Sequence, residues 1–89
     1  MQKITSLDEL KRESLYNDKT GMSEFYILLN GGSRSSKRIV YYPDTNTYDV
    51  HNEIDYSYQE DLTEEQLDHE TQITFAIEQG ALLNMSFSV

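Results

Sequence analysis

Apolar residues follow a strand-like pattern through the middle of the chain. Residues 24–29 are apolar on both faces, as expected of a buried strand, and residues 37–42 form a second apolar run after a polar connection. In residues 47–54, Tyr48, Val50 and Ile54 alternate with polar side chains, which predicts a third strand with one buried face. Pro-Asp-Thr-Asn at residues 43–46 is a strong turn sequence. The pattern therefore predicts a three-stranded antiparallel meander.

Helical spacing precedes this meander. Residues 6–9, Ser-Leu-Asp-Glu, have the spacing of a capping box, in which the serine caps an amide three residues on and the glutamate reaches back. Ile4, Leu7, Leu10 and Leu15 lie roughly along one helical face. These two signals predict a helix from about residue 7 to residue 16.

Helical spacing returns after the meander. Residues 63–66, Thr-Glu-Glu-Gln, are a second capping box and open a short helix. Thr71 is a candidate cap for a further short helix over residues 73–77, which Gly80 would end in a left-handed conformation. Residues 55–61 are predicted as a loop or a strand extension, and alternation in residues 83–89 predicts a closing strand in the same sheet. Residues 1–89 are thus predicted to form one small α+β domain, with an N-terminal helix, the meander and one or two short helices.

Charge is distributed unevenly along the chain. All seven Lys and Arg residues lie in residues 1–38, whereas residues 39–89 contain eleven acids and no Lys or Arg. A net charge of −9 argues against direct nucleic-acid binding, because neutralising phosphates needs a broad basic surface. The chain has no cysteine, no apolar run of about 20 residues that would span a membrane, and no apolar N-terminal segment typical of a signal peptide. We therefore expect a soluble cytoplasmic protein without nucleic-acid or membrane partners.

The polar connection between the first two strands is the leading candidate for ligand binding. Glycines allow successive backbone amides to converge on an anion, and the surrounding serines and cations supply further donors. The connection is not a P-loop, because the sequence lacks the G-x-x-x-x-G-K-S/T pattern and no helix is predicted directly after the connection. A polar hairpin loop whose glycines only supply positive φ is the simpler reading. The candidate ligand-binding residues are Asn30, Gly31, Gly32, Ser33, Arg34, Ser35, Ser36, Lys37 and Tyr41.

An acidic stretch is the second candidate surface. Residues 44–70 contain ten Asp and Glu residues and no Lys or Arg, together with several tyrosines, a residue type enriched in interfaces. Carboxylates spaced along a strand and a helix can imitate a phosphate backbone and occupy the basic groove of a protein. A solvated acidic face that keeps a small protein soluble is the alternative. The candidate partner-binding residues are Asp55, Glu60, Asp61, Glu64, Glu65 and Asp68.

Catalytic and metal-binding patterns are weak in this sequence. Residues 44–55 begin like a calcium loop, but Tyr48 and Asp49 replace an expected ligand and the essential glycine. His51 and His69 have no partner at ligand spacing, and no nucleophile elbow or Ser-His-acid order is evident. We therefore predict no enzyme activity, no metal and no cofactor.

Three segments resemble a family of short accessory proteins from phages and prophages of Gram-positive bacteria. The resembling residues are Leu-Asn-Gly-Gly-x-Arg-Ser-Ser-Lys at 29–37, the pair Asn52–Asp55 and Leu62–Gln66, and Ala76–Leu82. The family carries no activity that the resemblance could transfer. It implies a context in which small proteins bind stoichiometrically to a host defence component, by blocking a host protein or by sequestering a nucleotide signal.

Two functions from different classes follow from these surfaces. The preferred one is capture of a phosphorylated, nucleotide-like small molecule by the Gly31–Lys37 loop, with Arg34 and Lys37 pairing the phosphate and Tyr41 stacking a base. The alternative is an acidic inhibitor or nucleic-acid mimic that presents residues 44–70 to a basic groove of a host protein. The sequence leaves a homo-oligomer open.

Overall fold

The computed structural model describes residues 2–17, 24–28 and 34–84 of the chain. It confirms the predicted α+β class with an N-terminal helix, a meander, short helices and a C-terminal strand. The elements, in chain order, are β1 (Gln2–Lys3), α1 (Leu7–Asn17), β2 (Glu24–Leu28), β3 (Arg34–Tyr42), β4 (Thr47–Asn52), β5 (Tyr58–Leu62), α2 (Glu64–Thr71), α3 (Ile73–Glu78) and β6 (Leu82–Asn84).

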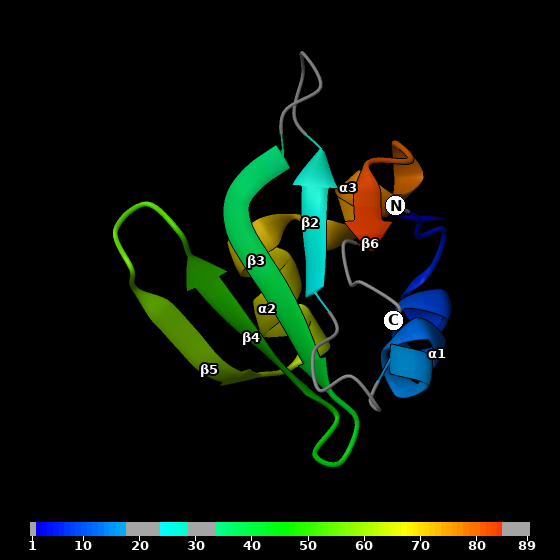
Figure 1. Cartoon of the computed structure of the whole chain (residues 1–89), viewed down its shortest axis with the longest axis horizontal. Coiled ribbons are helices and arrows are strands. Elements are labelled where there is room, and N and C mark those ends of the chain that lie inside the picture. The colour runs from blue at the N-terminus through cyan, green and yellow to red at the C-terminus, as the bar shows by residue number, and fades with distance from the viewer. Residues whose placement is uncertain (1, 18–23, 29–33, 85–89) are drawn as a thin grey trace.

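The six strands form one antiparallel sheet in the order β1-β6-β2-β3-β4-β5 (Figure 1). The predicted meander corresponds to β2, β3 and β4. The predicted closing strand is present as β6, which lies between β1 and β2, although it begins at Leu82 and residues 85–89 are outside the described part of the chain. The segment predicted as a loop or strand extension contains β5, which forms the edge of the sheet beyond β4.

The third strand is shorter than the sequence pattern predicted. β4 ends at Asn52, and Ile54 lies in the following turn with 76% of its surface exposed, so its predicted burial is wrong. The side-chain oxygen of Asn52 accepts hydrogen bonds from the backbone N–H groups of Ile54 (2.9 Å) and Asp55 (3.4 Å). Such an Asx turn reverses the chain two residues before the apolar alternation ends.

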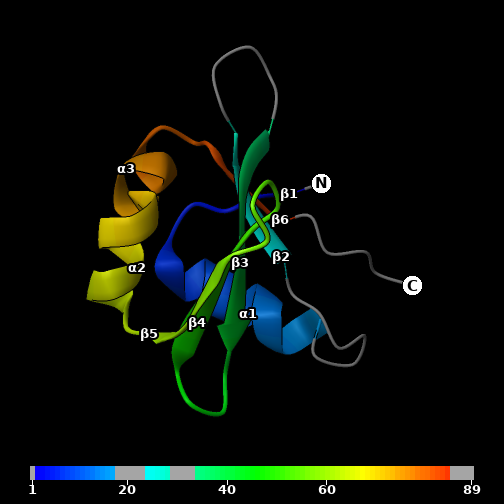
Figure 2. The same ribbon diagram turned by 90° about the vertical axis from the view of Figure 1, so that its left-hand side faces the viewer.

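Helices α2 and α3 lie on one face of the sheet, and α1 begins on that side and extends beyond the strands (Figure 2). Side chains from all three helices close the core against the sheet. Leu10 of α1, Leu67 of α2 and Ile73 of α3 are fully buried against Phe25 and Tyr48 of the sheet and their neighbours. The core also contains Ile4, Ile39, Tyr41, Val50, Leu62 and Leu82.

The buried face of α1 differs from the prediction at one position. Leu15 is 59% exposed, whereas Ser14 is only 2% exposed and donates its hydroxyl hydrogen bond to the Leu10 carbonyl (2.8 Å). Positions 7, 10 and 14 share one face at 100° per residue, and position 15 is turned away from it. A serine satisfies the buried position because its hydroxyl bonds back to the helix.

The caps of α2 and α3 arise from side chains close in sequence. Thr63 and Gln66 form the predicted capping box, each accepting the other's backbone N–H. The predicted cap at Thr71 is wrong: Thr71 belongs to α2 and donates to the Leu67 carbonyl, and Asp68 accepts from the Thr74 N–H instead. At the other end of α3, Gly80 has φ +66° as predicted.

Candidate functional site

Only part of the predicted ligand-binding loop falls in the described residues. Asn30, Gly31, Gly32 and Ser33 lie outside them. β3 begins at Arg34, whose backbone pairs with Leu28, so the strand starts three residues before the predicted start at Lys37, and Ser35 and Ser36 belong to it and not to a loop.

These residues lie in an irregular β-bulge of β3. Tyr26 pairs with Arg38 and Leu28 pairs with Arg34, so three residues of β3, Ser35–Lys37, face the single residue Ile27 of β2. The Ser35 hydroxyl accepts the Lys37 N–H (3.0 Å), and the Ser36 carbonyl accepts the Glu53 N–H from the turn after β4 (2.8 Å). A bulge bends its strand and re-aims the side chains that it carries.

The bulge directs Lys37 toward the helices. The Lys37 ammonium donates a hydrogen bond to the backbone carbonyl of Glu70 near the end of α2 (3.0 Å). A carbonyl in the last turn of a helix has no intrahelical partner and carries partial negative charge, so a lysine is favoured there. One of the three ammonium donors is used in this contact, which holds the amine at the junction of α2 and α3.

A groove of about 820 Å³ opens beside this lysine. Its walls come from the ends of β1, β2 and β3 and from the junction of α2 with α3. The lining residues are Lys3, Ile27, Leu28, Ser35, Lys37, Glu70, Thr71, Gln72, Phe75, Ala76, Gln79, Gly80 and Ala81. This volume lies within the usual range for small-molecule sites, and the mixture of apolar walls with a few polar groups is also typical of them.

Tyr41 is not part of this groove. It lies four residues after Lys37 on β3, roughly 13 Å along the strand. Its side chain is buried in the core, where its hydroxyl donates a hydrogen bond to Asn46 Oδ1 (2.8 Å). The centroid of its ring lies 4.9 Å from the ring centroid of Tyr48. Among the predicted ligand-binding residues with described side chains, the groove therefore contains Ser35 and Lys37, but neither Ser36 nor Tyr41.

Among the groove residues that the sequence analysis did not propose for ligand binding, Lys3 and Phe75 supply a cation and an aromatic ring. Lys3 lies on β1, which pairs only with the last strand and carries too short an apolar pattern to be recognised. Phe75 is 58% exposed on α3. The apolar positions predicted for that helix, Ile73, Ala76 and Ile77, form one face, so a phenylalanine outside this face was a usable signal for an exposed aromatic ring.

The predicted acidic residues lie along β5 and α2. Glu60 and Asp61 are exposed on the edge strand, and Glu64 and Glu65 are exposed in the first turn of α2. Glu64 forms an ion pair with Lys11 of α1 (2.5 Å), and this interaction raises the pKa of the lysine. Asp55 lies apart from the others in the turn between β4 and β5.

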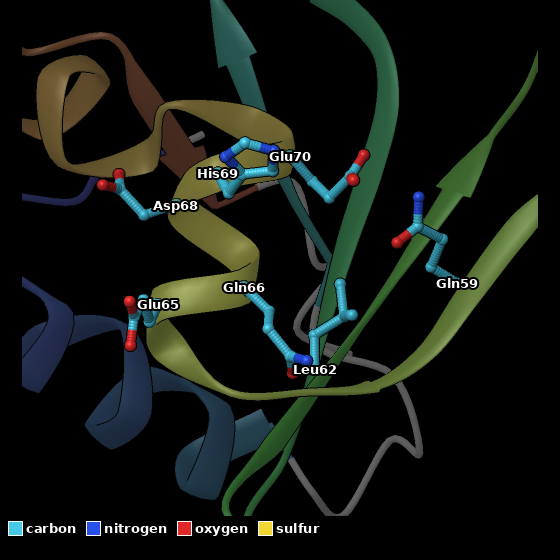
Figure 3. Close-up of a pocket in the computed structure, with 7 residues that line it drawn as sticks. All are labelled: Gln59, Leu62, Glu65, Gln66, Asp68, His69 and Glu70. Carbon is cyan, nitrogen blue, oxygen red and sulfur yellow. The ribbon is translucent and has the colours of Figure 1, made fainter.

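A hollow of about 520 Å³ separates β5 from α2 (Figure 3). It is lined by Gln59, Leu62, Glu65, Gln66, Asp68, His69 and Glu70. Figure 3 shows Glu65 and Asp68 on one side of α2, whereas Glu70 extends toward the sheet. The carboxylates diverge, so this hollow does not form a converging acid–base or cation-binding group.

A second acidic hollow of about 440 Å³ lies between β5 and the turn that joins β3 to β4. It is lined by Tyr42, Pro43, Asp44, Thr45, Thr47, Asp49, Glu60 and Asp61. Partial burial and the neighbouring Asp49 carboxylate raise the pKa of Tyr42, which therefore stays neutral at physiological pH. Both hollows beside β5 would repel an anion.

Neither a metal-binding cluster nor a membrane-spanning helix is found among the described residues. No group of three or more His, Cys, Asp or Glu side chains in the described ranges is arranged to hold a metal ion. None of the described helices is long and apolar enough to span a bilayer.

Comparisons with known proteins leave the chain without an identified relative. No protein-family model, curated protein or solved structure matched it.

Proposed function

We propose that the protein is a non-catalytic binding protein for a phosphorylated, nucleotide-like small molecule. The groove between the ends of β2 and β3 and the junction of α2 with α3 is the proposed site. In keeping with the resemblance to phage accessory proteins, the proposed role is to sequester a nucleotide signal in the cytoplasm of a bacterial host.

One observation carries this proposal: Lys3, Ser35 and Lys37 line the same groove of about 820 Å³. Two of the three lysines in the described part of the chain thus lie at one site, although the protein has a net charge of −9. The groove is lined by two lysines and one acid, Glu70, whereas the hollows beside β5 are lined by acids without Lys or Arg, so a phosphate is favoured at the groove over the β5 edge.

Four groove residues have a defined role in the proposal. The ammonium groups of Lys3 and Lys37 pair with the phosphate, and the Ser35 hydroxyl contributes a hydrogen bond. Phe75 offers its exposed ring as a stacking surface for a base, and so replaces Tyr41 in this role. Residues 29–33 and Arg34 follow Leu28 of the groove wall directly in the chain and remain candidates for further phosphate contacts.

Thermal unfolding in the presence of nucleotides, cyclic nucleotides and inorganic phosphate tests this function. A ligand at about 100 times its Kd adds about 2.7 kcal/mol to the free energy of unfolding. In a domain of this size, that increment raises Tm by roughly 10–20 °C. We expect at least one base-containing phosphate to stabilise the protein and inorganic phosphate to do so less.

Matched charge-removing variants assign the effect to the groove. Lys37→Met and Lys3→Met should each reduce the ligand-induced rise in Tm, whereas Arg12→Met removes a positive charge from an exposed position of α1 and should leave it unchanged. If no phosphorylated compound shifts Tm at millimolar concentration, or if Arg12→Met reduces the shift as much as Lys37→Met does, the proposal is wrong.

A further inference from the structure

The turn between β4 and β5 exposes three large side chains in a short segment. Ile54 is 76%, Tyr56 is 86% and Tyr58 is 58% exposed. We call residues 53–58 the hairpin tip. It projects from the β5 edge, away from α3 and β6, and shares no residue with the groove described above (Figure 1).

Hydrogen bonds within the hairpin tip hold its backbone in one shape. The side-chain oxygen of Asn52 accepts hydrogen bonds from the N–H groups of Ile54 and Asp55, and the backbone carbonyl of Asn52 accepts one from the Tyr56 N–H (3.0 Å). The Asp55 carboxylate accepts from the Ser57 N–H (2.9 Å) and the Ser57 hydroxyl (2.6 Å). A surface ordered in this way loses little conformational entropy when it binds.

The ring of Tyr58 is also held in place. It stacks on His51 of the neighbouring strand, with ring centroids 5.7 Å apart and an interplanar angle of 21°. The hairpin tip therefore displays an ordered aromatic ring, an adjacent exposed tyrosine and an exposed isoleucine.

Tyr56 occupies a backbone conformation that disfavours it. Its φ is +61°, in the left-handed region where glycine and asparagine are preferred and a bulky residue is an outlier. Local strain of this kind persists where the surrounding structure enforces it, and it is concentrated at functional sites. A glycine would suit the backbone of this turn better, but it would remove the most exposed ring of the hairpin tip.

The charges around the hairpin tip select the kind of partner. Glu53 accepts a hydrogen bond from the Tyr26 hydroxyl (2.6 Å) and lines a hollow beside the hairpin tip together with Arg38. The remaining exposed carboxylates close to the three large side chains in the chain are those of Asp55 and Glu60. A second copy of the chain would bring these carboxylates against one another, which disfavours self-association at this surface. A protein with an apolar cleft flanked by Lys and Arg has the complementary charge.

We propose that the hairpin tip is a preorganised docking surface for such a basic partner protein. Ile54, Tyr56 and Tyr58 enter the apolar cleft, and the surrounding carboxylates pair with its basic rim. Tyrosines in an ordered centre with charges at the rim are the usual arrangement of a binding hot spot. The acidic residues of α2, Glu64, Glu65 and Asp68, lie outside this surface. The inference is independent of the groove and of its ligand.

A library of random 16-residue peptides displayed on phage provides a probe of this surface without a known partner. Selection on the immobilised protein, with no nucleotide present, should enrich peptides that combine aromatic or aliphatic residues with flanking Lys or Arg. The Kd of synthetic versions should rise as the salt concentration increases, because the rim contacts are ionic. Tyr58→Ser should weaken binding at least about 10-fold, as expected of a hot-spot residue. Leu15→Ser changes an equally exposed residue on α1, 59% against 58%, and should leave Kd unchanged.

Tyr56→Gly separates binding from folding. Because it relieves the left-handed strain, we expect it to keep or raise Tm, yet to weaken the selected peptides at least about 10-fold. The inference is wrong if the selected peptides bind Tyr56→Gly and Tyr58→Ser as tightly as the wild type. It is equally wrong if selection yields no peptide or only peptides without basic residues. None of these outcomes affects the nucleotide-dependent Tm shift that tests the groove.

Discussion

Gly80 shows how a single backbone angle sets the end of α3. Its φ is +66°, its N–H donates to the Ile77 carbonyl (3.0 Å), and the Ala81 N–H donates to the Ala76 carbonyl (2.8 Å). This pair of hydrogen bonds is the Schellman motif, which needs a left-handed residue that glycine adopts without a steric penalty. No other atom lies within 4 Å of the position of an added Cβ.

We therefore predict that Gly80→Ala destabilises the protein through backbone strain alone, by about 1 kcal/mol. Chemical denaturation should show a lower midpoint with an unchanged m-value. Gly80→Asn, which tolerates the left-handed region better, should lose less. Equal losses for alanine and asparagine would argue against the backbone explanation.

Two neighbouring tyrosines in the core, Tyr41 and Tyr48, whose ring planes are tilted by 45°, provide a matched test of buried hydroxyl groups. The Tyr48 hydroxyl is buried near the Glu64 carboxylate but forms no hydrogen bond of normal geometry with a described residue, whereas the Tyr41 hydroxyl donates to Asn46 Oδ1 (2.8 Å). Burial raises the pKa of Tyr48 strongly, so its phenol stays neutral.

Tyr48→Phe should therefore leave the free energy of unfolding unchanged or raise it by up to about 1 kcal/mol, because it removes an unsatisfied polar group. Tyr41→Phe should lower it by about 1 kcal/mol, because it breaks a hydrogen bond and leaves Asn46 without this donor. Urea denaturation of both variants measures the difference. A loss at Tyr48 as large as that at Tyr41 would show that the Tyr48 hydroxyl has a stabilising partner.

At the residue scale, the sequence predicted two local signals correctly but missed two others and the direction of one helix face. The capping box at Thr63 and Gln66 and the stop at Gly80 are local, and both are confirmed. The burial of Ser14 in place of Leu15 was missed, because the direction of the α1 face is set by the sheet on which it packs. Ile54 was misplaced because the Asx turn at Asn52 competes with the apolar alternation.

At the scale of the elements, the turn between β4 and β5 depends on the ionisation of one carboxylate. Hydrogen bonds from the Ser57 hydroxyl and N–H lower the pKa of Asp55 below its ordinary value of 3.8. A lowered pKa means that the folded turn favours the charged carboxylate. The contribution of Asp55 to stability is therefore complete above pH 3.8 and is lost as the pH falls through the lowered value.

Nuclear magnetic resonance (NMR) spectra recorded from pH 7 to pH 2 should show the Ser57 amide signal moving with the titration of Asp55, at a midpoint below 3.8. Ser57→Ala removes the hydroxyl donor and should bring this midpoint closer to the ordinary value. A midpoint at or above 3.8 in the wild type would contradict the hydrogen-bonded turn.

Elements were predicted well where their sequence is apolar, and poorly where a strand is short or polar. The meander was recognised from two apolar runs and one alternating segment, but β1 and the separate strand β5 were not, because both are short and carry few apolar residues. The start of β3 was also missed. The sequence Arg-Ser-Ser at its first positions is typical of a loop, and only pairing with β2 through a bulge makes it a strand.

At the scale of the whole molecule, the uneven charge of the chain becomes a division in space. The β5 edge, with its two acidic hollows, lies at one side of the sheet (Figure 1). The groove with Lys3 and Lys37 lies where β2 ends and β3 begins. Half of this division was visible in the sequence, because residues 39–89 have no Lys or Arg. The groove was not, because it joins residues that are up to 78 positions apart, from Lys3 to Ala81.

The most direct measurement of the central claim is an NMR titration of the ¹⁵N-labelled protein with the phosphorylated compound that raises Tm most. The groove account predicts saturable shifts of the amide signals of Ser35, Lys37, Phe75 and Ala76, with the signals of Tyr58 to Asp61 unchanged. Lys37→Met should raise the Kd from this titration, and Arg12→Met should not. Shifts confined to β5 or to residues outside the groove, or a Kd that Lys37→Met leaves unchanged, would contradict the account.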